Sequence, residues 1–257
     1  MTLDLAAWLM LGLAALFAGL VDAVVGGGGL IQVPALFSAF PMLAPSALFG
    51  TNKLSSIWGT AFAARSYARR IAIDWEIVLP ASAAALVSGF AGAYAISIFP
   101  PQVFRKLLPF ILLLVALYVL RCREFGAEYR PSRSGRRKQL LAAGVGAFIG
   151  LYDGFFGPGT GSFLIFMFVR WFGLDFLRAS AVAKLVNVAC NFAALAWFLP
   201  KGQPLWMLGL WMAACNVLGS VAGARWALRG GARMIRWLFL MVLAALILKT
   251  GLDAFAR

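Results

Sequence analysis

The stretch GLVDAVVGGGG at residues 19–29 recurs 131 positions later as GLYDGFFGPGT at residues 150–160. Runs of glycine, or glycine alternating with proline, continue a helix only at a high cost, because glycine loses much conformational entropy and proline lacks an amide proton. Both stretches lie in apolar surroundings, and each carries one aspartate, Asp22 or Asp153. The sequence therefore predicts a duplicated chain in which both halves break a helix at the same place.

The duplication extends far beyond the two glycine-rich stretches and needs no gap. Further residue pairs at the same spacing are Lys53 and Lys184, Leu54 and Leu185, Trp75 and Trp206, Gly92 and Gly223, and Arg105 and Arg236. One aspartate and one lysine in each half lie within the apolar segments at matched positions. An internal duplication that keeps charges inside apolar segments is typical of a secondary transporter.

Composition indicates a polytopic membrane protein. The 257 residues are 63% hydrophobic and 12% charged, whereas soluble domains carry about 25% charged residues. The net charge of +14 comes from basic residues between apolar segments, which indicates cytoplasmic loops rather than a nucleic-acid partner. The chain contains no histidine, which excludes Ser-His hydrolases and histidine metal sites. We therefore expect no enzyme activity, no metal and no cofactor.

The apolar runs predict the fold class. They fall at 5–24, 29–44, 46–64, 76–98 and 104–120, and again at 139–155, 159–172, 177–199, 205–227 and 234–252. In each half we expect the first two runs to form a glycine-broken hairpin of half-helices or short helices, and the last three to cross the membrane. The predicted fold is an all-α polytopic membrane protein with two inverted repeats, at residues 1–120 and 139–257, joined by a basic cytoplasmic linker at 121–138.

The distribution of basic residues favours inverted repeats over parallel ones. With the N-terminus outside and an odd number of crossings in each half, the basic residues of 65–70, 121–138 and 225–236 all fall on the cytoplasmic side, as the positive-inside tendency requires. Parallel repeats would place 225–236 outside. Both termini then lie outside the cytoplasm. Arg236 fits least well, because its counterpart Arg105 falls outside.

The two glycine breaks are candidate anion-binding sites. Unpaired backbone at membrane depth is tolerated only where protein or a water-filled cavity surrounds it, and a helix that resumes there presents free N–H groups to an anion. The residues concerned are Gly26, Gly27, Gly28, Gly29, Gly157, Gly159, Thr160 and Gly161. Close helix packing is the alternative. We prefer packing for Gly146 with Gly150 and for Gly219 with Gly223, and anion binding for the paired breaks.

Lys53 and Lys184 form a second candidate site. A lysine in the membrane costs about 2.5–3.5 kcal/mol on insertion scales, so each should face the interior and have a partner; the alternative is a lysine that snorkels to the interface. Polar neighbours accompany both lysines: Thr51, Asn52, Ser55 and Ser56 in the first half, and Asn187 and Asn191 in the second. Together with the helix N-termini, the lysines would bind a small oxyanion. Asp22 and Asp153 could relay protons or only neutralise the lysines, and the sequence leaves both roles open.

The duplicated glycine motif after an acidic residue, the Asn52-Lys53-Leu54 stretch and the basic central linker resemble the TauE/SafE family of sulfite and organosulfur anion exporters. The resemblance covers roughly residues 8–250. It implies a bacterial inner-membrane permease for anions such as sulfite, sulfoacetate or thiosulfate, coupled to protons. The second half has Ala183 where the first has Asn52, and Pro158 where the first has Gly27, so the two half-sites are not expected to be equivalent.

Two other classes of function remain as alternatives. One is a passive anion channel or facilitator with the same charged lining. The other is a membrane scaffold protein in which the charges are packed ion pairs. The partners expected from the sequence are a small anionic substrate, the lipid bilayer and coupling protons.

Overall fold

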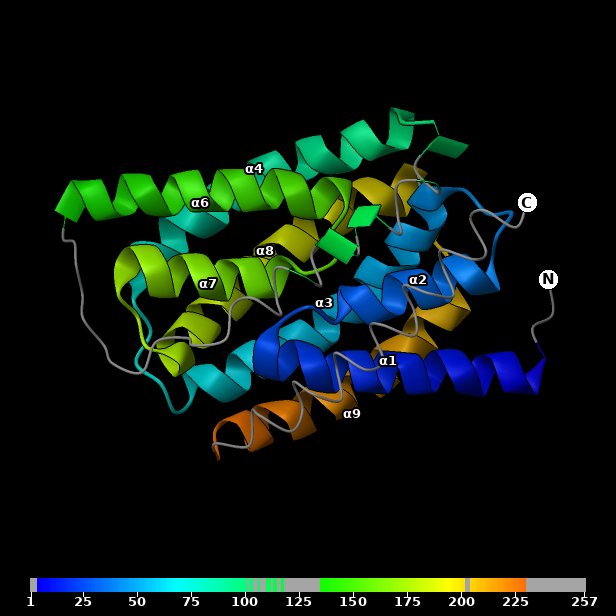
Figure 1. Ribbon diagram of the computed structural model, residues 1–257, viewed down its shortest axis with the longest axis horizontal. Helices are drawn as coiled ribbons and strands as arrows, with labels where there is room; N and C mark the ends of the chain where they lie inside the picture. The colour runs from blue at the N-terminus through cyan, green and yellow to red at the C-terminus, as the bar shows by residue number, and fades with distance from the viewer. Residues whose placement is uncertain are drawn as a thin grey trace.

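The computed structural model describes residues 4–100, 135–201 and 204–229, and isolated positions between 101 and 118. These residues form helices and contain no strand, so the all-α prediction is confirmed for them. The first half contains α1 (Leu5–Val25), α2 (Gly29–Ala39), α3 (Pro45–Ala68) and α4 (Trp75–Ile98). The second contains α6 (Gly135–Phe155), α7 (Thr160–Phe172), α8 (Phe176–Lys201) and α9 (Trp206–Ala227) (Figure 1).

The duplication predicted from sequence is visible in the helix boundaries. The helices α2, α3 and α4 each begin 131 residues before α7, α8 and α9. The first element of each half differs from our expectation of short helices or half-helices. Both α1 and α6 have 21 residues, or about 31 Å of helix. The short elements are α2, with 11 residues, and α7, with 13.

Four of the described helices, α1, α4, α8 and α9, are long and apolar enough to cross a membrane. The helix α3 has 24 residues, but polar side chains in its middle reduce its hydropathy. The expected crossings at 104–120 and 234–252 lie outside the described residues, apart from isolated positions in the first. Most of the 121–138 linker also lies outside them, but its last basic residues, 136–138, belong to the first turn of α6.

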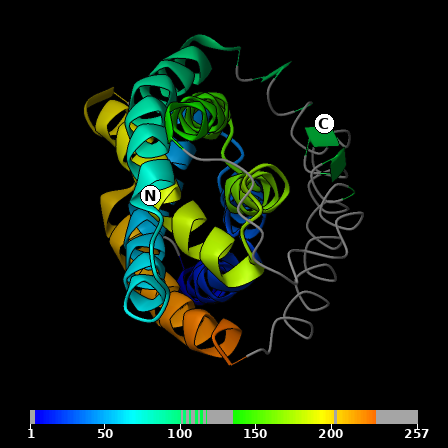
Figure 2. The same ribbon diagram turned by 90° about the vertical axis from the view of Figure 1, so that its left-hand side faces the viewer.

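The helices pack in a pattern that repeats between the halves. The outer pairs are α1 against α9 and α4 against α6, while α3 and α8 pack on each other at the centre. Under the duplication α1 corresponds to α6 and α9 to α4, so the two outer pairs are equivalent contacts. Seen end-on, these pairs lie on opposite sides of α3 and α8 (Figure 2). The halves therefore interlock, with each outer pair containing one helix from each.

Glycine makes these outer contacts close. A β-carbon on Gly92 of α4 would overlap the carbonyl oxygen of Leu151 in α6, and one on Gly223 of α9 would overlap that of Leu20 in α1. The two contacts are equivalent under the 131-residue period. The other glycines for which we preferred close packing behave in the same way, and that prediction is confirmed for Gly146, Gly150, Gly219 and Gly223.

Hydrogen bonds between helix ends show which ends lie together. The Trp211 indole donates to the Trp8 carbonyl at 3.0 Å, so α9 and α1 begin at the same end of the molecule. Lys138, in the first turn of α6, pairs with Asp74 at 2.7 Å and Glu76 at 3.0 Å, so α6 begins beside the start of α4. The chain passes from the end of α3 to the start of α4 there, opposite to the end where α1 and α9 begin (Figure 1).

Two glycines of α6 provide a matched test of this packing. We expect Gly146→Ala to lower the free energy of unfolding by about 1–3 kcal/mol, because its β-carbon would overlap the backbone of Ala81 in α4. Gly144→Ala should be neutral or stabilising by up to about 1 kcal/mol, since no atom lies within 4 Å of its β-carbon. Thermal unfolding of the purified variants in one detergent measures both. Equal effects would contradict the close contact of α4 with α6.

Candidate functional site

A small polar cavity lies where the two glycine breaks meet the middle of α3 and α8. About 30 Å³ of it is open to water-sized molecules, roughly two to three times what one water needs. Its lining comes from both halves. The lining residues are Asp22, Gly27, Gly28, Gly29, Asn52, Lys53, Ser56, Thr60, Asp153, Gly157, Gly159, Thr160, Gly161, Asn187, Asn191 and Asn216.

Glycine is required at the breaks because the backbone adopts positive φ angles there. The helix α1 ends at Gly26 with φ of 74°, and its counterpart Gly157 has φ of 90°. The halves then diverge. Gly27 has φ of 102°, which the ring of Pro158 at the matching position cannot adopt, and the second half instead places Gly159 at φ of 87°. One glycine-to-proline difference thus changes the path of the second break.

The two breaks pack directly on each other. The Ser162 hydroxyl, at the start of α7, donates to the carbonyl oxygens of Val25 at 2.9 Å and Gly26 at 3.1 Å. A β-carbon on Gly26 would overlap the backbone of Gly161. These contacts bring glycines from residues 26–29 and 157–161 to one site, although they are far apart in the sequence.

The four membrane charges form two ion pairs, and each pair joins the halves. The Lys53 ammonium lies 2.5 Å from the Asp153 carboxylate, and the Lys184 ammonium lies 2.8 Å from that of Asp22. The lysine side chains are 3% and 0% exposed, which rules out snorkelling. Each lysine is neutralised by the aspartate of the other half, and removing one member of such a buried pair is costly.

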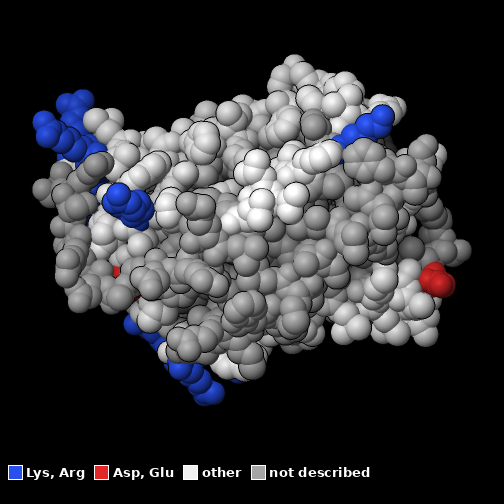
Figure 3. Space-filling model, viewed as in Figure 1, with Lys and Arg blue, Asp and Glu red and all other residues white. Residues whose placement is uncertain are grey.

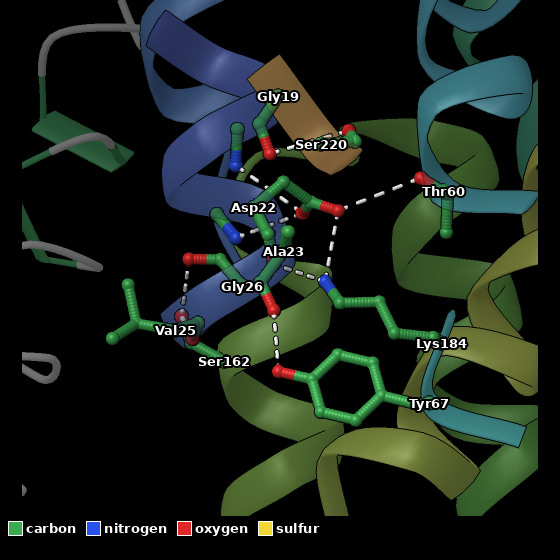
Figure 4. Close-up of polar contacts among 12 residues, drawn as sticks. Gly19, Asp22, Ala23, Val25, Gly26, Thr60, Tyr67, Ser162, Lys184 and Ser220 are labelled. Carbon is green, nitrogen blue, oxygen red and sulfur yellow. Dashed lines mark hydrogen bonds and ion pairs between the residues drawn. The ribbon is translucent and has the colours of Figure 1, made fainter. Parts of the chain in front are cut away.

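The carboxylate of Asp22 is saturated with donors. Its Oδ1 accepts from the N–H groups of Gly27 at 3.2 Å and Gly28 at 3.4 Å. Its Oδ2 accepts from Lys184 and, at 3.5 Å, from the Thr60 hydroxyl. Lys184 also donates to the backbone carbonyl of Asp22 (Figure 4). The N–H groups of the first glycine break, which we expected to bind an anion, are therefore directed at the protein's own carboxylate.

The carboxylate of Asp153 has fewer donors. Its Oδ2 accepts from Lys53 and its Oδ1 from the Thr160 hydroxyl at 2.7 Å. Pro158 stands where the first half has Gly27 and has no N–H group to donate. The sequence difference between the two breaks thus explains one of the two backbone donors that Asp22 has and Asp153 lacks.

The helices α3 and α8 present polar residues to the cavity in the same register. Ser56 and Thr60 follow Lys53 by three and seven positions, and Asn187 and Asn191 follow Lys184 by the same intervals. Such spacings place side chains on one helix face. The first half therefore presents hydroxyl groups where the second presents carboxamides.

Most of the residues predicted from sequence line this one cavity. The exceptions are Gly26, which packs against the second break, and Lys184, which lies behind Asp22 and is fully buried. Sequence reasoning noted Ser56 as a polar neighbour of Lys53 but did not include two other lining residues, Thr60 and Asn216. The matched register after Lys53 and Lys184 would have indicated Thr60. Asn216 could have been noted as an amide inside the apolar run 205–227.

The sequence matches the family described as Sulfite exporter TauE/SafE over residues 11–250. The chain belongs to the TauE/SafE family. This match covers both halves and all of the cavity residues. TauE/SafE proteins are membrane transporters, so the duplicated polar cavity lies in a protein of that general class.

Curated TauE/SafE relatives carry the same general description. The chain is 37% identical over 240 residues to a probable membrane transporter protein, ORF9, of a Sinorhizobium species, covering 93% of this chain and 90% of the relative. It is 36% identical to a probable membrane transporter protein of Haemophilus influenzae, covering 85% and 84%. It is 33% identical to the probable membrane transporter protein YfcA of Escherichia coli, covering 93% and 88%. No solved structure matches the chain.

The charges at the site balance. Lys53 and both aspartates line the cavity, Lys184 pairs with Asp22 from outside it, and the remaining lining side chains are amides and hydroxyls. The described residues include no group of three or more Cys, Asp or Glu that could hold a metal ion. An anion that enters must therefore compete with a carboxylate for a lysine, or bind through neutral donors.

The pair of Lys184 with Asp22 should be testable through stability. Lys184→Met leaves the buried carboxylate without its counter-ion, and we expect unfolding free energy to fall by about 3–5 kcal/mol. Adding Asp22→Asn should restore most of this loss, because the amide oxygen still accepts from Gly27 and Gly28. Thermal unfolding in detergent compares the variants. A double variant as unstable as Lys184→Met alone would show that the charge pair is not the cause.

Proposed function

We propose that this protein is a secondary transporter that moves a small sulfur-containing oxyanion, such as sulfite, sulfoacetate or thiosulfate, across the bacterial inner membrane with coupled protons. The observation that carries the proposal is the buried Lys53–Asp153 pair in the wall of a small polar cavity. The TauE/SafE relationship supports the transporter class. The nature of the anion rests on the name of the family and on the donors in the cavity.

The ion pair provides a physical basis for proton coupling. While Asp153 is ionised, it satisfies Lys53, and an arriving anion meets a carboxylate in the same small space. A proton on Asp153 removes that negative charge and frees the ammonium, which then forms a charge-assisted hydrogen bond to the anion. Anion and proton thus bind together, and for a singly charged anion the site has the same net charge with both bound as when empty.

The difference in donors supports this role for Asp153 rather than Asp22. Hydrogen bonds to an ionised carboxylate favour its charged form, and Asp22 receives two backbone N–H bonds that Asp153 does not have. The titratable neighbours of Asp153 are Lys53, Tyr152 and Cys190. We propose that Lys53 binds the anion, and that the pair of Lys184 with Asp22 holds the halves together.

The arrangement of helix ends supports inverted repeats. The equivalent helices α1 and α6 begin at opposite ends of the molecule (Figure 1). Basic side chains gather at the end where α6 begins (Figure 3). The helix ends and loops concerned carry Arg65, Arg69, Arg70, Arg136, Arg137, Lys138, Arg170, Arg178, Arg225 and Arg229. The positive-inside tendency makes this end cytoplasmic and the start of α1 periplasmic.

Labelling of single introduced cysteines tests the orientation. We expect residues 65–70, 121–138 and 225–229 to react only with reagents that enter the cytoplasm, and position 4 to react from the periplasm. The measurement is modification in intact cells by a membrane-impermeant maleimide, with permeabilised cells as the control. Periplasmic labelling at 225–229 would refute the inverted arrangement.

Transport measurements on reconstituted protein test the role of Asp153. In the unaltered protein, anion uptake should rise as the pH on the uptake side falls, because protonation of Asp153 frees Lys53. Asp153→Asn should still bind anions but lose this pH dependence, while Asp22→Asn, the matched control, should keep it and be less stable. Lys53→Ala should weaken anion binding by about 1.5–3 kcal/mol.

Three results would count against this proposal. A pH dependence lost in Asp22→Asn but kept in Asp153→Asn would reverse the assignment of the two aspartates. Uptake that never exceeds equilibrium under an imposed proton gradient would favour a passive channel. Anion transport unaltered in every variant, with stability reduced, would show that the charges are only structural.

A further inference from the structure

The hydroxyl of Thr160 has one hydrogen and two acceptors within reach of it. Its Oγ1 lies 2.7 Å from Oδ1 of Asp153 and 2.7 Å from the carbonyl oxygen of Gly157. A threonine hydroxyl donates a single hydrogen bond, and this one is buried at the start of α7. While Asp153 is ionised, the hydroxyl can donate to the carboxylate or to the carbonyl, and the other oxygen then lies against it with no hydrogen between them.

A proton on Asp153 removes this conflict. A neutral carboxyl group carries an O–H donor, so Oδ1 of Asp153 can donate to Oγ1 of Thr160, and Thr160 can donate its own hydrogen to the carbonyl of Gly157. Both 2.7 Å contacts are then hydrogen bonds. The Gly157 carbonyl also accepts from the backbone N–H of Thr160 at 3.2 Å, and that bond is the same in both states. The second glycine break thus has a place for a proton.

The first glycine break has no such arrangement. The position that matches Thr160 is Gly29, which has no side chain. Oδ1 of Asp22 instead accepts from the N–H groups of Gly27 and Gly28. An N–H group donates but cannot accept, so these two partners suit the ionised carboxylate and not the protonated one. A hydroxyl suits both forms, because it can donate to a carboxylate and accept from a carboxylic acid.

We infer that Thr160 is the positioning residue for the coupled proton: it accepts the hydrogen of protonated Asp153 and passes its own hydrogen bond to Gly157. The proton then resides on Oδ1, while Oδ2 is the oxygen that contacts Lys53. Thr160 therefore stabilises the state in which the Lys53 ammonium is free for an anion. This inference rests on the proposed function, and it adds the residue that holds the proton.

Other titratable groups near Asp153 stay in place when Thr160 is changed. They are Lys53 on α3, Tyr152 on α6 and Cys190 on α8. From α1, Asp22 lines the same cavity and is paired with Lys184. A change in pH dependence caused by substituting Thr160 therefore reports on its contact with Asp153.

Removal of the hydroxyl tests the inference. In Thr160→Val, protonated Asp153 loses its acceptor and Gly157 loses a donor, whereas ionised Asp153 keeps Lys53. The protonated form is disfavoured more, so the pH of half-maximal uptake should fall by about half to one unit, equivalent to threefold to tenfold weaker anion binding at one pH. The measurement is uptake of labelled thiosulfate, which does not itself titrate near neutral pH, by the reconstituted full-length protein.

Conservative and distant substitutions provide the controls. Thr160→Ser keeps the hydroxyl and should keep the pH profile of the unaltered protein. Ser88→Ala removes a hydroxyl that bonds within α4 and does not line the cavity, and it should cause no shift. Thr160→Ala takes the place of Thr160→Val if the valine variant does not fold, since the matching position in the first half is a glycine.

A second background separates proton placement from direct anion binding. Asp153→Asn does not titrate and keeps Lys53 free of a carboxylate. In that background, Thr160→Val should change thiosulfate affinity by less than about twofold, the usual limit for independent changes. In the presence of Asp153, the same substitution should weaken binding by the threefold to tenfold given above. Calorimetry at one pH and ionic strength measures both ratios.

Each contrary outcome has a definite meaning. An unchanged pH profile in Thr160→Val would overturn the inference and leave the proposed function standing. A shift to higher pH would overturn it too, because the hydroxyl would then serve mainly the ionised carboxylate. Equal weakening in the Asp153 and Asp153→Asn backgrounds would show that Thr160 contacts the anion or only supports the fold. Uptake by the unaltered protein that is absent or independent of pH would overturn the inference together with the proposed coupling.

Discussion

The pairing of each membrane lysine with the aspartate of the other half is the constraint on which the rest of the structure depends. An isolated charge at this depth costs several kcal/mol, so Lys53 and Lys184 can be buried only if Asp153 and Asp22 reach them. That requirement brings the middle of α3 and α8 against the ends of α6 and α1. The glycine breaks, which end α1 and α6 just after the aspartates, let the backbones approach closely enough.

One substitution between the repeats converts this symmetric frame into an asymmetric site. In the first half, the N–H group of Gly27 donates a hydrogen bond to the Asp22 carboxylate. The second half has Pro158 at the matching position, and proline has no N–H group. That difference removes one of the two backbone donors that Asp22 has and Asp153 lacks. The Asp22 carboxylate is held by more donors than that of Asp153, so the two ion pairs are suited to different roles. In the proposed mechanism the Lys184–Asp22 pair joins the halves, and Lys53 exchanges the Asp153 carboxylate for an anion when Asp153 is protonated. Duplication followed by local divergence thus separates a structural role from the proposed transport role.

The same divergence explains the polar character of the cavity. Hydroxyl groups of the first half make hydrogen bonds within the protein, as Ser56 does with Gln32 and Asn52. In the second half, the matching Asn187 lines the cavity with Phe163 and Ala183 as the counterparts of those partners. The first half therefore pairs its polar side chains within the protein, whereas in the second half Oδ1 of Asn187 has no hydrogen-bond partner among the described residues. Such an arrangement suits a binding site that closes around one small ligand rather than two related ones.

The sequence by itself determined the helical class, the 131-residue period, the residues that needed partners and nearly all of the cavity lining. It could do so because apolar length, helix-breaking glycines and buried charges each carry a local physical cost that a single sequence displays. The sequence did not predict the length of α1 and α6, because a glycine break indicates where a helix ends but not where it begins. Only the tertiary structure decided that Lys53 pairs with Asp153 and Lys184 with Asp22, and that Lys184 and Gly26 lie outside the cavity. Those choices depend on which parts of the two halves meet in space, over separations of 100 residues and more, and the matched positions of a repeat cannot show whether partners come from the same half or from the other.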